Sequence, residues 1–252
     1  MNIAKVPAAH GLKWLLQGFV LLRRNFYIWL AFVLMLWALV FIAARIPFAG
    51  VMLALLTPVF LGGLMIGART VEKGEALQIA HFFAGFRTNT LNLITLGGVY
   101  LVGNVVIAGM MYGIGGTAIQ QIVAGQSQNV DPATLAQAIG PALMALLVGM
   151  VLSVPLTMAL WFSPLLVVFE NSKPAPALRD SFRACLKNTV PFLVYGLIVL
   201  IPLVLLMLPF DLSSMDRNPG LWVTALLVLP SIYTSYRDIF QQAPSAPTDS
   251  AP

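Results

Sequence analysis

The most polar side chain inside the long apolar stretches of this chain belongs to Asn104. Tyr100 and Thr95 lie on roughly the same helical face, so together these groups could line a cavity for a polar or amphipathic solute. A polar side chain in a membrane helix can also simply hydrogen-bond to a neighbouring helix. We therefore treat Asn104 and Tyr100 as a candidate intramembrane polar site, and take interhelical packing as the preferred interpretation.

Other chemistry is sparse. His10 and His81 have no cysteine or carboxylate at metal-ligand spacing, and Cys185 has the basic residues Arg183 and Lys187 nearby but no histidine. No charged residue falls inside an apolar stretch, as a proton or ion path would require. We expect no catalytic residues, no cofactor and no metal, and hence not an enzyme.

Three asparagines recur in a shared pattern. Each follows a phenylalanine with five residues between, has a base one or two places before it and precedes an apolar stretch: Asn25, Asn89 and Asn188. Asparagine tolerates left-handed backbone geometry and bonds to backbone groups at helix ends. We predict that all three form structural corners where the chain turns from the membrane interface into the bilayer.

The elements that position these residues are six apolar stretches. Each has about the length that a helix needs to cross a hydrocarbon core of roughly 30 Å. Hydrophobic residues make up 59% of the chain and charged residues 9%, which excludes a soluble domain. The fold class is therefore an all-α membrane bundle with six predicted spans: Phe26–Ala44, Pro47–Ala68, Leu91–Gly116, Pro141–Phe169, Pro191–Phe210 and Leu221–Tyr236.

Basic residues set the orientation. With six spans, only Arg45 and Arg217 of the 14 basic residues fall on one side, and the other 12 fall on the opposite side. The positive-inside rule makes that opposite side cytoplasmic. The prediction is a multi-pass inner-membrane protein with both termini in the cytoplasm. The same bias explains the net charge of +5, so we expect no nucleic-acid partner.

The cytoplasmic segments before the first, third and fifth spans are amphipathic. They predict helices lying in the interface, apolar face inward and basic face toward anionic headgroups. Membrane lipids are thus the expected partners, and a membrane-protein partner is a further candidate. The predicted headgroup contacts are Arg23, Arg24, Arg87, Arg179, Arg183 and Lys187.

These segments also predict an internal repeat. Each amphipathic helix precedes a hairpin of spans, giving one transmembrane domain over residues 1–240 with three parallel units of about 7–70, 71–172 and 173–240. Outside the membrane, Asp131-Pro132 predicts a short helix within the long loop Thr117–Gly140. The tail, residues 241–252, is rich in Pro, Ser and Ala and is predicted to be disordered.

Short motifs at the helix ends carry a resemblance. They are Gly85-Phe86-Arg87, Trp161-Phe162-x-Pro164, Ser181-x-x-Ala184-Cys185-x-x-Asn188 and Ser235-Tyr236-Arg237-Asp238-Ile239-Phe240. With these motifs the chain resembles a family of uncharacterised six-helix inner-membrane proteins of Gram-negative bacteria. The resemblance implies a location in the inner membrane, and it does not identify any functional residue.

Two main functions stay open, beside a less favoured third, a lipid-modifying enzyme, which would need a cluster of acid, base or metal ligands at one interface that the sequence does not show. The leading hypothesis is a protein that organises or assists components of the membrane or envelope through helix and lipid contacts, because basic amphipathic helices recur and no catalytic set does. The alternative is a transporter or channel for a small neutral or amphipathic solute, based on Asn104, Tyr100 and the proline-broken spans. A hollow, polar bundle interior would favour the alternative.

Overall fold

The computed structural model describes residues 3–125, 132–207 and 219–241, which are helical throughout with no strand. The elements in chain order are α1 (His10–Arg24), α2 (Phe26–Ala43), α3 (Ala49–Glu72), the 3-10 helix η1 (Ile79–Arg87), α4 (Thr90–Gly125), α5 (Pro132–Trp161), α6 (Ser163–Glu170), α7 (Pro174–Lys187), α8 (Thr189–Met207) and α9 (Pro219–Phe240).

Four stretches are long and apolar enough to cross a membrane. They are Phe26–Ala43, Ala49–Glu72, Thr90–Gln121 and Ala136–Glu170. A fifth is counted if α7 and α8, which meet at 82°, form one bent span. The protein is therefore an all-helical membrane protein with four to five candidate spans among the described residues. The sixth predicted span lies in α9, whose last third is rich in hydroxyl and charged side chains.

Several predicted boundaries shift. Most of the expected loop Thr117–Gly140 is helical, because α4 runs to Gly125 through a kink at Gly115 and α5 already begins at Pro132. The short separate helix expected after Asp131 is wrong, since Pro132 opens the 30-residue α5; Asp131 itself lies outside the described residues. The tail after Gln241 and most of Asp211–Gly220 also lie outside them.

The second amphipathic segment is a 3-10 helix, η1, between a capping box at Gln78 and an extended Thr88. The long return stretch of the second hairpin breaks at Phe162, where α5 ends and α6 begins. Pro164 explains the break, because it has no N–H to continue the α-helical ladder.

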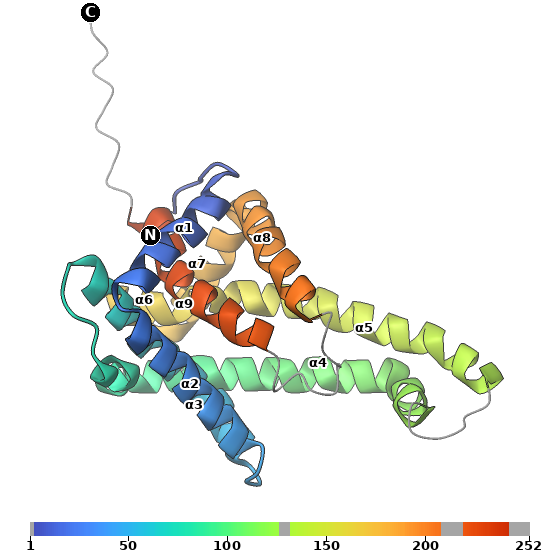
Figure 1. Ribbon diagram of the computed structural model, residues 1–252. Coiled ribbons are helices and arrows are strands. Elements are labelled where there is room, and N and C mark those ends of the chain that lie inside the picture. Colours follow the sequence, from blue (N-terminus) through green and yellow to red (C-terminus); the bar gives the residue numbers. More distant parts are fainter. Residues whose placement is uncertain (1–2, 126–131, 208–218, 242–252) are drawn as a thin grey trace, which may run out of the picture.

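One end of the molecule is compact (Figure 1). We call this end the collar: α1, η1, α6 and α7 with residues 58–72 of α3 and 229–240 of α9. Its core is aromatic and includes the fully buried Trp14, Phe82, Tyr233 and Tyr236. The buried side chains of Trp29 and Phe32 from α2, and of Phe162 at the α5–α6 break, belong to the same hydrophobic cluster. From the collar the helix pairs α2–α3, α4–α5 and α8–α9 leave in diverging directions.

Each amphipathic helix of the collar packs on the last helix of a hairpin. For η1 and α7 this is the hairpin just before them in the chain, and for α1 it is the hairpin that ends with α9. A Cβ at Gly63 of α3 would lie 2.6 Å from the carbonyl oxygen of His81 in η1. Ser181 of α7 accepts a hydrogen bond from the Phe162 N–H (2.9 Å) at the α5–α6 break. Gly18 of α1 lies against the backbone of Ser231 in α9. The first helix thus rests on the last.

Candidate functional site

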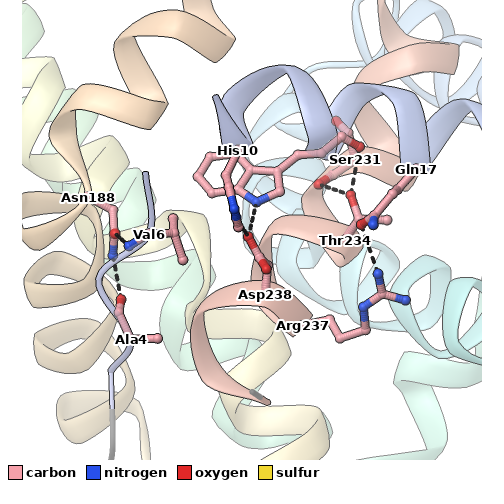
Figure 2. Close-up of polar contacts among 10 residues, drawn as sticks. Ala4, Val6, His10, Gln17, Asn188, Ser231, Thr234, Arg237 and Asp238 are labelled. Carbon is pink, nitrogen blue, oxygen red and sulfur yellow. Dashed lines mark hydrogen bonds and ion pairs between the residues drawn. The ribbon is translucent and has the colours of Figure 1, made fainter. Parts of the chain in front are cut away.

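A polar network joins three helices inside the collar. The Arg237 guanidinium of α9 is paired with the Glu72 carboxylate at the end of α3 and donates to the Gln17 side chain of α1 (2.8 Å). Tyr233, one turn earlier in α9, donates its hydroxyl to Glu72 (2.5 Å). Figure 2 shows the Arg237–Gln17 contact. Glu72 is thereby satisfied by two donors from α9.

Two other acids are bound in the same region. Asp238 contacts the His10 ring nitrogen (2.6 Å) and accepts from the Trp14 indole N–H (2.8 Å), so α1 is tied twice to α9 (Figure 2). Glu170, at the end of α6, accepts from the Tyr236 hydroxyl (2.9 Å). The carboxylates that end α3 and α6 therefore both bind side chains of α9.

We call this set of contacts, made by Glu72, Glu170, Tyr233, Tyr236, Arg237 and Asp238 with their partners, the clasp. Charge-assisted hydrogen bonds are stronger than bonds between neutral groups, and here they link elements that are distant in sequence. Among the described residues no group of three or more His, Cys, Asp or Glu side chains could hold a metal ion. Cys185 of α7 is buried, and that burial raises the pKa of its thiol to about 12, which suits a packing residue and not a nucleophile.

The three corner asparagines lie between helices, as their spacing predicts, and each side chain bonds to a distant backbone. Asn188 is 1% exposed; its Oδ1 accepts from the Val6 N–H (2.9 Å), and its Nδ2 donates to the carbonyls of Ala4 and Ala184 (3.0 Å each). Figure 2 shows its side chain facing the N-terminal segment. Asn188 therefore holds the chain start beside the α7–α8 corner.

Asn89 and Asn25 make fewer bonds. Asn89 has φ +51°, and its Nδ2 donates to the Val167 carbonyl (3.0 Å) and to Asn171 Oδ1 (2.7 Å). Asn25 Oδ1 accepts only a long bond from the Leu77 N–H (3.4 Å). The left-handed geometry expected of these corners occurs at Asn89 and not at the other two.

The predicted headgroup contacts are all exposed: Arg23, Arg24, Arg87, Arg179, Arg183 and Lys187. Arg23 lies over the Phe19 ring, Arg179 pairs with Asp180, and Lys187 donates to the Ile3 carbonyl (2.6 Å). Two hollows add further bases: one of about 340 Å³ is lined by Arg24, Arg237 and Glu72, and one of about 240 Å³ by Arg69, Lys73 and Glu75.

The predicted intramembrane polar pair is local to α4. Asn104 donates its side-chain N–H to the Tyr100 carbonyl one turn earlier (2.8 Å), and the Tyr100 side chain is exposed. The structure thus places these two residues together through a bond within one helix.

The clasp residues were not singled out from the sequence. No role for Glu72, Glu170 or Tyr233 was predicted from the sequence, and Asp238 appeared there only within a motif. The available signal was the run Ser235-Tyr236-Arg237-Asp238, an unusually polar end for an apolar helix. That run does not identify its partners, which lie 66 residues away in α6, 165 away in α3 and 220 to 228 away in α1.

Comparison with known proteins finds a "Probable inner membrane protein" of Burkholderia thailandensis that is 30% identical over 270 residues. The alignment covers 98% of this chain and 97% of the Burkholderia protein. No family model and no solved structure matches the chain.

Proposed function

The chain belongs to the same family as this Burkholderia inner-membrane protein, and from that premise we propose that it organises or assists membrane components through helix and lipid contacts. One observation carries the proposal. The hairpins diverge from the collar and leave most of their surface uncovered: within an apolar 18-residue section of each span, the share buried inside the protein is 17% in α2, 39% in α3, 17% in α4 and 11% in α5–α6. Such faces must be covered by lipid or by other membrane helices.

The collar supplies a second support, because its amphipathic helices keep apolar side chains exposed. On α1 these are Leu12, Leu16 and Phe19, and on η1 they are Ile79 and Phe83. In our proposal these stripes enter the headgroup boundary while the neighbouring bases face anionic lipid. The collar then fixes how the hairpins stand in the bilayer.

We further propose that the protein has six spans built from three parallel units, with both termini in the cytoplasm. The cyclic contacts support the repeat. Asn25 bonds to the segment that leads into η1, Asn89 to the segment that leads into α7, and Asn188 to the segment that leads into α1. Each corner asparagine therefore bonds to the segment that begins the next unit, and the asparagine of the third unit bonds to the segment that begins the first. This relation is expected of threefold pseudo-symmetry around the collar.

A reporter fusion tests the orientation. A reporter active only outside the cytoplasm, inserted between Gln126 and Asn129, is expected to give signal, and the same reporter placed after Gln241 is expected to give none. A cytoplasmic reporter at the same two sites is the matched control and should show the opposite pattern. Signal outside the cytoplasm from the C-terminal fusion would overturn the six-span topology.

Photo-crosslinking in native membranes tests the function. A photoreactive residue at Val102, Leu147 or Leu200, exposed by 62%, 53% and 51%, is expected to capture a defined membrane protein as well as lipid. The same residue at Leu64, which is 1% exposed, is expected to give crosslinks within the chain only. Adducts with lipid alone at all three exposed sites would contradict a role in organising protein partners.

The second candidate function, transport of a small neutral or amphipathic solute, would be favoured by a hollow, polar interior. The groove of about 430 Å³ between α5 and α8 is apolar, and its residues do not include Asn104 or Tyr100, so it does not supply that feature.

A further inference from the structure

The groove between α5 and α8 has two regular walls. The α5 wall follows one helical face, with residues at spacings of three and four: Met150, Ser153, Val154, Thr157, Met158 and Trp161. The α8 wall consists of Thr189, Phe192, Leu193, Tyr195 and Gly196, most of them at the same spacing. Cys185 lies at the collar end. The volume of about 430 Å³ is within the range of small-molecule sites.

The length of the groove matches one leaflet of a bilayer. From Met150 to Trp161 is 11 helical residues, or about 16 Å at 1.5 Å per residue. That is roughly half of a hydrocarbon core of about 30 Å. Since Trp161 is at the collar end and Met150 lies deeper, the groove runs from the headgroup level of one leaflet toward the midplane.

The same positions are filled in the other two units. Eight residues after each corner asparagine stand Val33, Gly97 and Gly196. Val33 is 1% exposed, and Gly97 is pressed against the Leu55 backbone. Gly196 is exposed, and a Cβ there would meet no atom within 4 Å. The third unit thus leaves open a position that the protein itself closes in the first two.

The positions four residues after each corner asparagine show the same difference in burial between the units. Trp29 and Leu93 are fully buried, whereas Phe192 is partly exposed to the groove. The position of α8 is set by other helices than α5: the Tyr195 hydroxyl bonds to Ser231 of α9 (2.7 Å), and Gly11 of α1 abuts the Pro191 carbonyl. Helix α8 therefore leans away from α5.

We propose that this groove binds one acyl chain of an anionic phospholipid from the surrounding membrane, with the headgroup at the α7–α8 corner. The inference rests on the proposed membrane placement and goes beyond general lipid contact to one specific site. The walls are apolar along their length and offer few polar groups, which fits a hydrocarbon chain and not a polar solute.

Charge complementarity identifies the headgroup. Cys185 and Thr189, which both line the groove, flank the α7–α8 corner. At that corner Lys187 is exposed and donates to the Ile3 carbonyl of the N-terminal segment, which also carries exposed Lys5. The acid of α7, Asp180, is paired with Arg179. The corner next to the groove thus presents exposed basic groups, which favour a phosphodiester headgroup with net negative charge over a zwitterionic one.

The test uses the full chain in phosphatidylcholine vesicles doped with phosphatidylglycerol that carries a photoreactive acyl chain. Mapped adducts are expected on Met150, Val154 and Leu193. Gly196→Phe fills the groove and is expected to lower labelling there at least fivefold, while Gly98→Phe, at nearly the same depth on α4 and also in open space, leaves it unchanged. Thermal unfolding of both variants is measured as the control for folding, since a Cβ at either position meets no atom within 4 Å.

A second part of the experiment tests the headgroup. Lys187→Gln is expected to reduce labelling by photoreactive phosphatidylglycerol at least threefold relative to photoreactive phosphatidylcholine, and Lys13→Gln on exposed α1 is expected to change nothing. Labelling spread evenly over the exposed hairpin faces, or unaffected by Gly196→Phe, would overturn the site. Groove labelling with no protein captured from the hairpins would sustain the site and refute the organising role, so the two proposals can fail separately.

Discussion

Replacing Asn188 by leucine is expected to destabilise the protein by about 2–4 kcal/mol. The change removes three hydrogen bonds at a position that is 1% exposed and leaves the Val6 N–H and the Ala4 and Ala184 carbonyls without that partner. Unsatisfied buried polar groups cost about 1–3 kcal/mol each, and partial access to water lowers that cost. In a chain of this size the apparent Tm in detergent should fall by roughly 4–16 °C.

The other two corners serve as graded controls. Asn25→Leu removes a single bond of 3.4 Å and is expected to cost less than about 1 kcal/mol. At Asn89, leucine loses two bonds and also strains a backbone at φ +51°, whereas Asn89→Gly loses the bonds and keeps the geometry. Equal losses at all three corners would show that the contacts in the structure do not set their energies.

Replacing Gly85 by alanine is expected to disrupt the packing of η1 against α3. A Cβ at Gly85 would overlap the carbonyl oxygen of Val59 and lie 3.1 Å from the Gly63 nitrogen. Both neighbours are backbone atoms, so no rotamer change relieves the clash and the helices must separate. Overpacking of this kind costs about 1–3 kcal/mol, and the separation would also disturb the contact between the tilted rings of Phe60 and Phe82.

Thermal unfolding in detergent and limited proteolysis of the segment 73–90 measure this effect. The matched control is Gly98→Ala, where the new methyl group meets nothing within 4 Å and the helix gains up to about 1 kcal/mol. An unchanged Tm and an unchanged cleavage rate for Gly85→Ala would mean that η1 is not fixed to α3 in the membrane.

The physical requirements of a bilayer explain which parts of this fold could be predicted from the sequence. Backbone polar groups must be satisfied within each span, so apolar stretches such as Phe26–Ala44 predicted helix positions to within a few residues. The extent of α4 was missed because Gly115 and Gly116 were taken as a helix end, whereas the chain kinks there and continues as helix. The spacing of Asn25, Asn89 and Asn188 predicted three corners between helices.

The partners of those residues could not be predicted from one sequence. A corner motif is local, but the Asn188 side chain binds Ala4 and Val6, and Arg237 binds Glu72 from more than 160 positions away. These pairings depend on how the hairpins are arranged around the collar, which no periodicity encodes. The groove is a further case, because Gly196 reads like Gly97 in sequence and differs only in where α8 leans.

The clasp between the two ends of the chain has a consequence for biogenesis. Ala4 donates its backbone N–H to the Ile239 carbonyl (2.9 Å), and His10 and Trp14 both contact Asp238. Asp238 is synthesised more than 220 residues after His10 and Trp14, so during synthesis the first helix stays without these partners while the hairpins between them insert. The collar then closes as a late, post-insertion step with long sequence separation. A nascent chain stalled before Arg237 would hold inserted spans and an unanchored first helix, which is the state that membrane quality-control proteases would meet.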